Sequence, residues 1–249
     1  MSRVVAVIQA RCGSSRLPGK VLRPLGGVPA IHHVVRAVSS AKKVDEVVLA
    51  TTTAAVDDAL VAEGEALGVR VFRGDEEDVL RRFVEALRGD PADVVARQPA
   101  DAPLVDPDII DAVLEAYQKG GCDYAASFLE RSWPRGCESE VISREALERS
   151  DREAYRPEDR EHVTIHVRTH PEVFRLRNVR APEAEVWPEL RLTLDTPEDY
   201  AVLEKVFAAL WRPGRILRIS EVIAWMRAHP QVAEINAEVA QKPVLGRVL

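Results

Sequence analysis

The sequence predicts an α/β fold in which a mostly parallel, doubly wound sheet carries helices on both faces. Short apolar runs alternate with amphipathic helical patterns through roughly the first 120 residues. Each apolar run ends in a polar loop, as buried parallel strands do where they approach a ligand. The length of 249 residues and the hydrophobic content of 46% allow a sizeable core in one domain.

Four strand-then-helix units are expected in the first half. The first strand is a continuous, partly β-branched run that ends in a Gly-containing segment. Proline in a first turn and acids at a helix N-terminus mark several helix starts. The expected strands are 4–8, 47–50, 69–72 and 93–96, and the expected helices are 29–38, 57–67, 76–87 and 107–118. Consecutive units of this kind pair their strands in parallel.

The second half has a less regular pattern and is expected to form an α+β insertion. It contains no internal repeat, low-complexity segment or linker, so residues 1–249 are expected to form a single domain. The expected strands are 123–128, 140–143, 174–179 and 191–194, with a turn at 133–136. The expected helices are 144–148, part of 156–168, 197–210 and 220–228.

Composition excludes several classes of protein. A net charge of −6 with 5% aromatic residues argues against a nucleic-acid partner, which usually requires a basic face and stacking rings. The three cysteines, Cys12, Cys122 and Cys137, lack the spacing of a disulfide framework or a zinc site. No signal peptide is recognisable and no apolar run approaches the ~20 residues of a membrane span. The sequence therefore predicts a soluble, cytoplasmic protein with no membrane partner.

The segment after the first strand has the composition of a phosphate-binding loop. Residues 11–20 contain the cations Arg11, Arg16 and Lys20, together with two glycines and two serines. Glycine lets backbone N–H groups approach a phosphate, and arginine grips its oxygens bidentately. The spacing matches neither a P-loop nor a dinucleotide fingerprint, so a solvated basic turn is the alternative. The position directly after the first strand favours phosphate binding.

Two aspartates follow expected strands. Asp101 lies in a loop after the fourth strand, and Asp195 lies just before the helix that begins at Pro197. Both are expected at carboxyl ends of strands, where a parallel sheet gathers its ligands. Mg²⁺ is commonly held by one or two carboxylates together with substrate phosphates. The alternatives are a turn-forming role for Asp101 and a helix N-terminal role for Asp195.

Several motifs together resemble one protein family. Residues 8–11 and 13–22 closely resemble the opening of the spore coat polysaccharide biosynthesis protein F family, which is similar to the cytidylyltransferases that make CMP-sialic acid and CMP-3-deoxy-manno-octulosonate. Further matches are 49–52, 72–74, Asp101 with 103–107, 140–141, 160–164 and 192–199. The resemblance runs nearly the full length of the chain. It implies a nucleotide-diphospho-sugar transferase-like, Rossmann-like fold, CTP as substrate, and a homodimer.

The resemblance also implies roles for individual residues. It places the nucleotide in the half before about residue 120, and the acceptor and dimer contacts in the half after it. The nucleotide-binding residues would be Gln9, Ala10, Arg11, Gly13, Ser14, Arg16, Lys20, Thr51, Arg73, Gly74, Arg97 and Gln98. Mg²⁺ would be held by Asp101 and Asp195, and these two residues with Arg11 and Lys20 would form the catalytic set. A small sugar-type acceptor would be bound by Trp133, Arg135, Glu140, Arg160, Glu161 and His162.

Other interpretations remain open at this stage. Residues 160–162 could be a surface charge cluster, and the spacing of His162, His166 and His170 would suit zinc if one helix carried all three, although Pro171 would end it. A glycosyltransferase of similar fold usually has an Asp-x-Asp motif, and none follows the strand at 93–96. A uridylyl- or guanylyltransferase and a non-catalytic nucleotide-binding protein are the remaining alternatives.

Overall fold

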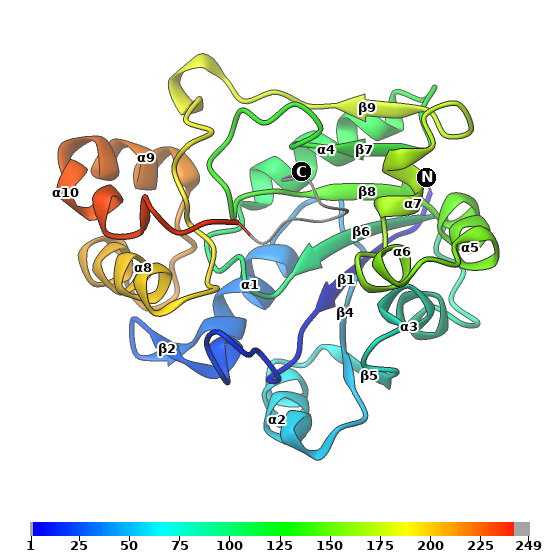
Figure 1. The fold of residues 1–249 in the computed structure, drawn as a ribbon, viewed down its shortest axis with the longest axis horizontal. Helices are drawn as coiled ribbons and strands as arrows, with labels where there is room; N and C mark the ends of the chain where they lie inside the picture. The colour runs from blue at the N-terminus through cyan, green and yellow to red at the C-terminus, as the bar shows by residue number, and fades with distance from the viewer. Residues whose placement is uncertain (1, 242–249) are drawn as a thin grey trace.

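The computed structural model of the protein describes residues 2–241 and builds them around one seven-stranded sheet (Figure 1). The strand order is β5-β4-β1-β6-β8-β7-β9. The strands are β1 (Val4–Gln9), β4 (Glu46–Thr52), β5 (Arg70–Gly74), β6 (Val94–Pro99), β7 (Tyr124–Ala126), β8 (Glu140–Ser143) and β9 (Leu176–Asn178). Strands from both halves of the sequence therefore belong to the same sheet.

The sheet is mostly parallel, as predicted. Strand β1 pairs in parallel with β4 and β6, and β4 pairs in parallel with β5. Strand β8 is antiparallel to both β6 and β7, while β9 is parallel to β7. Because β8 runs in the opposite direction, its first residue lies at the edge of the sheet where β6 ends. Side chains from the two halves of the sequence thereby meet at that edge.

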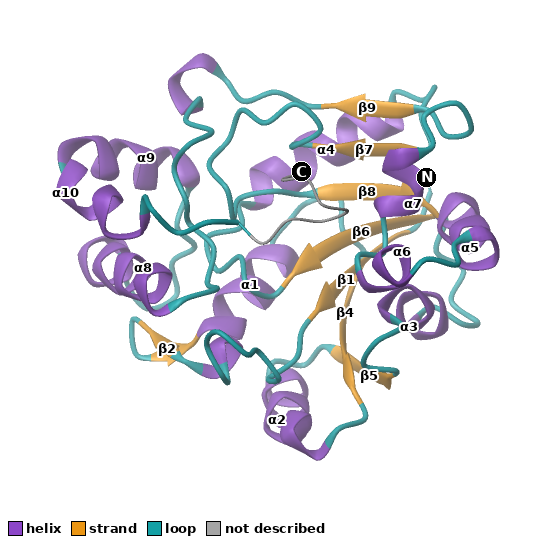
Figure 2. Cartoon of the chain, in the orientation of Figure 1, coloured by secondary structure: helices purple, strands orange, loops and turns teal. Residues whose placement is uncertain are grey.

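Helices cover both faces of the sheet, which confirms the doubly wound prediction (Figures 1 and 2). Alternate residues of β1 face opposite sides, as the two-residue period of a strand requires. Val4, Ala6 and Ile8 pack with α1 (Ala30–Ser39), α2 (Asp58–Ala66), α4 (Pro107–Gln118), α8 (Pro197–Leu210) and α9 (Ile219–Ala228). Val5 and Val7 pack with α3 (Val79–Ala86), α5 (Arg144–Glu153) and α7 (Ile165–Thr169).

Short elements complete the fold. They are β2 (Pro24–Leu25), β3 (Val28–Pro29), α6 (Pro157–Glu161), α10 (Pro230–Ala233), and the 3-10 helices η1 (Lys20–Leu22), η2 (Ala55–Asp57), η3 (Glu183–Glu185) and η4 (Glu234–Asn236). The β2–β3 hairpin was not predicted, because two-residue strands leave no periodic pattern. Its turn depends on Gly26 and Gly27, both at positive φ.

The predicted strand at 191–194 is wrong. Only Arg191 forms a bridge, to Arg135, and the segment is otherwise an extended connection. Its buried leucines produced the alternating pattern. The backbone N–H of Leu192 donates to Arg135 at 2.7 Å and that of Leu194 to Asp101 at 2.8 Å, so the segment bridges two loops instead of extending a ladder.

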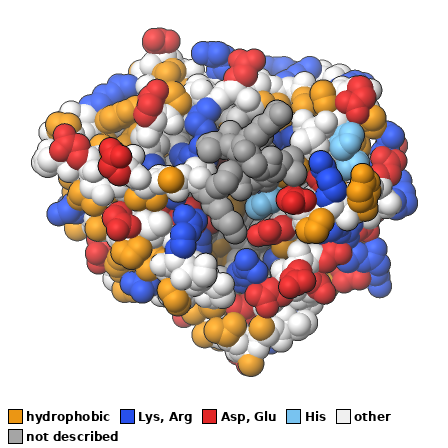
Figure 3. All heavy atoms as spheres, viewed as in Figure 1, with side chains coloured by type: hydrophobic (Ala, Val, Ile, Leu, Met, Phe, Trp, Pro, Cys, Tyr) orange, Lys and Arg blue, Asp and Glu red, His pale blue; other side chains and the backbone are white. Residues whose placement is uncertain are grey.

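The surface has no segregated charge on the face shown in Figure 3, where acidic and basic side chains are interspersed. Within residues 2–241, none of the helices combines the length and the apolar character that crossing a bilayer requires.

Candidate active site

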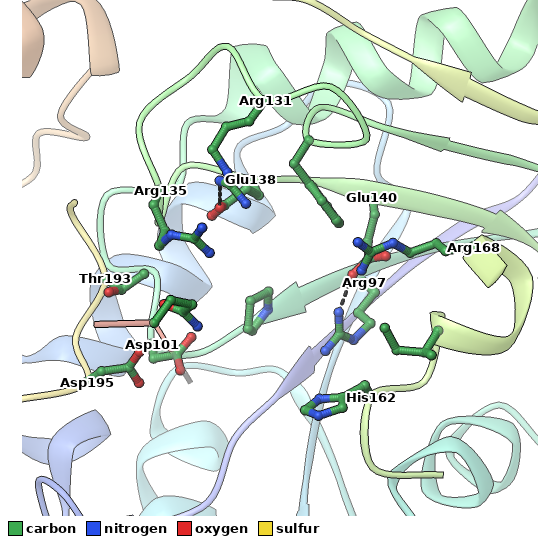
Figure 4. A pocket seen from close by; sticks show the side chains of 14 residues that line it. Arg97, Asp101, Arg131, Arg135, Glu138, Glu140, His162, Arg168, Thr193 and Asp195 are labelled. Carbon is green, nitrogen blue, oxygen red and sulfur yellow. Dashed lines mark hydrogen bonds and ion pairs between the residues drawn. The ribbon is translucent and has the colours of Figure 1, made fainter. Parts of the chain in front are cut away.

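A cavity of about 200 Å³ opens where β6 ends and β8 begins (Figure 4). It is lined by Arg97, Pro99, Asp101, Phe128, Arg131, Arg135, Glu138, Glu140, His162, Ile165, Arg168, Thr193, Asp195 and Gln241. Nine of these fourteen side chains are ionisable. The cavity is therefore suited to a polar, charged ligand and not to an apolar one.

The loop that leaves β1 folds back so that Lys20 points inward. The carbonyl of Cys12 accepts from the backbone N–H groups of Ser14 at 2.9 Å and Gly19 at 3.0 Å. Gly19 has φ of 66°, in the left-handed region that favours glycine, and the chain then enters η1. Cys12 and Leu17 are buried and anchor the loop to the core. The side chain of Lys20 is 12% exposed as a result.

A buried carboxylate fixes the start of this loop. Asp57 accepts from the backbone N–H of Cys12 at 2.7 Å, from the Thr51 hydroxyl at 2.9 Å, and from the Thr52 hydroxyl and N–H at 2.5 and 3.2 Å. Burial alone would raise the pKa of Asp57, but these donors outweigh it and lower the pKa. Asp57 therefore ties the loop after β1 to the end of β4.

Replacing Asp57 by Asn is expected to loosen the loop. The asparagine amide has a single oxygen that can accept hydrogen bonds, and its N–H₂ group would face groups that are themselves donors. We therefore expect a loss of about 2–3 kcal/mol of unfolding free energy. We also expect a roughly tenfold weaker nucleotide affinity. Thermal unfolding and nucleotide titration measure the two effects. The control is Glu65→Gln, because Glu65 is an exposed acid on α2. Equal behaviour of the two variants would show that Asp57 does not position the loop.

Asp101 and Asp195 converge on one cation. The Lys20 Nζ atom lies 2.8 Å from Asp101 Oδ2 and 2.7 Å from Asp195 Oδ1. Burial would raise the pKa of Asp195, but Lys20 and the neighbouring arginines outweigh it and lower the pKa. Burial likewise opposes the charge on Lys20, and the two aspartates raise its pKa. The residues predicted to hold the metal thus lie together, with an ammonium group between them.

Two arginines and a second carboxylate support Asp195. Arg16 lies 3.2 Å and Arg191 3.0 Å from Asp195 Oδ2. Arg191 is buried and also binds Asp199, whose side chain forms a capping box with Thr196 at the start of α8. Asp199 further accepts from the backbone N–H of Asp195 at 3.0 Å. The orientation of Asp195 is therefore set by a buried network and not by the loop alone.

Opposite charges also pair at the other end of the cavity. Arg97 and Glu140 are direct partners in the antiparallel register of β6 and β8, and their side chains form an ion pair. The Gln9 side chain accepts from Arg97 at 3.0 Å, while Glu140 accepts from Tyr124 at 2.5 Å and Thr164 at 2.7 Å. Burial would raise the pKa of Glu140, but Arg97 and then Arg168 outweigh it and lower the pKa.

The loop between β7 and β8 forms one wall of the cavity. Gly136 has φ of 98°, and a Cβ atom there would lie 2.6 Å from the backbone of Leu192, so only glycine fits. Glu138 pairs with Arg131 and accepts from the Gly136 N–H at 2.5 Å. Arg135, between them in sequence, points its guanidinium toward the cavity (Figure 4).

Several predicted site residues lie outside the cavity wall. The Thr51 hydroxyl is committed to Asp57, and Arg73 binds Asp58 and two backbone carbonyls. Arg160 pairs with Asp78 and Asp151, which tie α6 to α3 and α5. The Trp133 indole N–H donates to Glu185 at 2.9 Å. These contacts stabilise loops around the cavity.

The remaining predicted residues divide between the loop, the sheet and the surface. Arg11 is half-exposed beside Glu76, and Glu161 is exposed. Ala10, Gly74 and Gln98 are buried, and Gln98 donates to the Glu138 carbonyl at 3.0 Å. Gly13 and Ser14 belong to the loop after β1.

The three histidines with helical spacing do not share one helix. His162 lines the cavity, whereas His166 lies in α7 and packs against His170 with ring centroids 4.3 Å apart. Residues 2–241 contain no cluster of three or more side chains that could hold a metal ion. Between His162 and Thr164, Val163 has φ of 55°, a strained value for a β-branched residue. This turn places His162 on the cavity wall and the Thr164 hydroxyl on Glu140.

Sequence reasoning missed part of the wall. Phe128, Arg131, Glu138, Ile165, Arg168 and Thr193 line the cavity but were not predicted as site residues. They come from irregular loops and the short helix α7, where spacing does not indicate direction. Arg168 lies four residues beyond the motif 160–164, so the motif alone did not reach it.

Comparison with solved structures defines the class of the fold. CMP:2-keto-3-deoxy-manno-octonic acid synthetase, solved with CTP, aligns with a TM-score of 0.62 over 83% of this chain and 98% of that one, at 23% identity. The two chains therefore share the same fold. A cytidylyltransferase from Leptospira borgpetersenii aligns more fully, with a TM-score of 0.87 and 27% identity over 97% of this chain and all of that one.

The sequence comparison is more specific. The model of the cytidylyltransferase family matches residues 5–223, and the chain belongs to that family. The spore coat polysaccharide biosynthesis protein SpsF of Bacillus subtilis is 37% identical over 94% of this chain and 98% of its own length. The 3-deoxy-manno-octulosonate cytidylyltransferase of Trichlorobacter lovleyi is 35% identical over 46% of this chain and 45% of its own length. The predicted family resemblance is thereby confirmed.

Proposed function

We propose that this cytidylyltransferase transfers CMP from CTP to an oxygen of a small sugar-type acceptor and releases pyrophosphate. The observation that carries the proposal is the convergence of Asp101, Asp195 and Lys20 at one point beside a basic loop. The name of the SpsF relative supports a place in surface polysaccharide biosynthesis. Assembly as a homodimer remains a prediction, which sedimentation at micromolar concentration tests.

The residues fit a divalent cation. Two carboxylates already converge on a single positive charge, and Mg²⁺ binds with few protein carboxylates when phosphates complete its shell. Asp101 and Asp195 would hold the ion, which when bound neutralises negative charge on the triphosphate. The network of Arg191 and Asp199 keeps Asp195 oriented toward that position.

The chain's own groups orient and neutralise the reactants. In the proposed step, the acceptor oxygen bonds to the α-phosphorus while the bond to the bridging oxygen breaks, pyrophosphate leaves with the electron pair, and the acceptor proton passes to solvent. In this proposal Arg16 and Lys20, which contact Asp195, bind the phosphate oxygens together with Arg11 from the same loop. Holding the two substrates in line supplies much of the rate, because no covalent intermediate is required.

Nucleotide-dependent unfolding tests the proposal. With Mg²⁺, CTP is expected to raise the unfolding temperature well above UTP, GTP or ATP, since a ligand at a hundred times its dissociation constant adds about 2.7 kcal/mol. Pyrophosphate release with candidate acceptors then separates catalysis from binding. A preference for UTP or GTP would overturn the nucleotide assignment. Binding of CTP without turnover of any sugar acid, sugar phosphate or phosphonate would favour a non-catalytic nucleotide-binding protein.

A further inference from the structure

Most charges on the cavity wall are already paired. Arg97 pairs with Glu140, and Arg131 pairs with Glu138. Asp101 and Asp195 share Lys20, and Asp195 also contacts two arginines. Within residues 2–241, two lining guanidinium groups are left without a hydrogen bond or ion pair, those of Arg135 and Arg168.

The Arg168 guanidinium makes no hydrogen bond or ion pair to another residue of the range 2–241. It lies in α7, with its guanidinium carbon 4.9 Å from the centroid of the Phe128 ring, and its buried Nε atom lacks a partner among the described residues. Its charge lowers the pKa of Glu140, which lines the same cavity. Both oxygens of Glu140 are in use, one by Arg97 and the other by Tyr124 and Thr164. Arg168 is thus a donor held ready for an acidic ligand.

Arg135 is in the same situation at the opposite end of the cavity, near Asp195 and Thr193 (Figure 4). The two nearby carboxylates, Glu138 and Asp195, bind other cations. Burial lowers the pKa of Arg135, and the neighbouring Arg131 adds repulsion. A half-buried guanidinium is costly without a counter-charge, and an anion that enters the cavity would supply one.

We propose that the acceptor carries two separated anionic groups, each a carboxylate, phosphate or phosphonate, one bound by Arg135 near the metal-binding aspartates and the other by Arg168 at the remote end. This inference rests on the proposed function, because it assigns the substrate class of the same site. The two arginines come from different segments and face one cavity, so a molecule with a single anionic group would leave one of them unpaired. Arginine suits all three groups because its planar fork binds two oxygens at once.

Inorganic phosphate is the probe that counts these sites. The protein is first saturated with CTP and Mg²⁺, so that the nucleotide site is filled. Phosphate then replaces chloride at constant ionic strength, and its binding is measured by thermal unfolding and by isothermal titration calorimetry. The variants are Arg135→Met, Arg168→Met and the double substitution. Arg152→Met is the matched control, since Arg152 is exposed on α5 and makes no ion pair in the described part of the chain.

We expect two phosphate sites in the wild type, with one weakened at least tenfold in each single variant and both weakened in the double variant. Arg152→Met should retain both sites. A single site, or two sites that survive both substitutions, would overturn the proposal. More than tenfold weaker CTP binding in Arg135→Met would assign Arg135 to the nucleotide and also overturn it.

The outcomes separate this inference from the proposed function. Failure of CTP to stabilise the wild type contradicts the proposed function, whereas CTP binding without the two phosphate sites contradicts only the inference. A second probe set extends the test: 6-phosphogluconate carries an anion at each end, while gluconate and glucose 6-phosphate carry one each. In competition with phosphate, we expect 6-phosphogluconate to bind at least tenfold more tightly than either, and this advantage should disappear in Arg168→Met. Equal binding of the three probes would overturn the inference.

Discussion

Replacing either Asp101 or Asp195 by Asn is expected to reduce CTP-dependent pyrophosphate release by a factor of about 10² or more. Each substitution removes one of the two carboxylates that converge on a single cation position. An amide oxygen still fits the space but carries no charge to hold the ion. Pyrophosphate release at saturating CTP and Mg²⁺ measures the effect, and excess Mg²⁺ should restore part of the activity.

Stability measurements separate a lost ligand from a damaged fold. Asp101→Asn leaves Lys20 paired with Asp195, so its unfolding temperature should stay close to that of the wild type. Asp195→Asn removes charge from contacts with Lys20, Arg16 and Arg191, and is expected to be less stable. Asp108→Asn is the control, because Asp108 is an exposed acid at the start of α4. Full activity in both Asp101→Asn and Asp195→Asn would rule out the proposed metal site.

The regular part of the fold could be predicted because burial on both faces leaves a clear pattern. The continuous apolar run of β1 and the four successive strand-then-helix units of the first half predict a mostly parallel, doubly wound sheet. The register could not be predicted in the same way. The antiparallel direction of β8, which brings Glu140 to Arg97, depends on the long connection between β7 and β8 and has no local signal.

Site residues could be predicted where they directly follow a strand of the parallel part of the sheet. The loop after β1 and Asp101 follow strand ends, whereas Asp195 follows the extended connection at 191–194, and the structure brings Lys20, Asp101 and Asp195 together. The acceptor side depends on tertiary contacts. Arg160, chosen from a motif, turns away to Asp78 and Asp151, whereas Arg168 reaches the cavity because the strained turn at Val163 precedes α7.

This difference has a physical basis. A strand end in a parallel sheet fixes where its next side chains lie, because neighbouring strands hold the backbone. A short helix such as α7 is placed only by the residues packed beneath it, here the buried Val163 and Val167. The sequence therefore shows which residues of α7 are charged, but their spacing does not show which of them face the cavity.

Replacing Lys20 by Met is expected to have two separate effects. Loss of the ammonium should lower pyrophosphate release at least about a hundredfold, because the variant lacks a cation for the triphosphate. It should also leave Asp101 and Asp195 without their shared partner, at a cost of about 1–3 kcal/mol of unfolding free energy, because Asp195 keeps Arg16 and Arg191. Added Mg²⁺ or Mn²⁺ should then stabilise Lys20→Met in the absence of nucleotide.

The wild type should respond differently, since its Lys20 ammonium occupies the position between the two carboxylates that a metal ion would need. We therefore expect Mn²⁺ to bind Lys20→Met at least tenfold more tightly than the wild type when no CTP is present. Electron paramagnetic resonance of the unbound Mn²⁺ measures this affinity. Lys20→Arg is the matched control, because it keeps a cation at that position and should bind Mn²⁺ as weakly as the wild type. Adding Asp101→Asn to Lys20→Met should abolish the gain. Equal Mn²⁺ affinity in Lys20→Met and the wild type would mean that the ammonium does not compete with the metal, and the cation position would then have to lie elsewhere in the cavity.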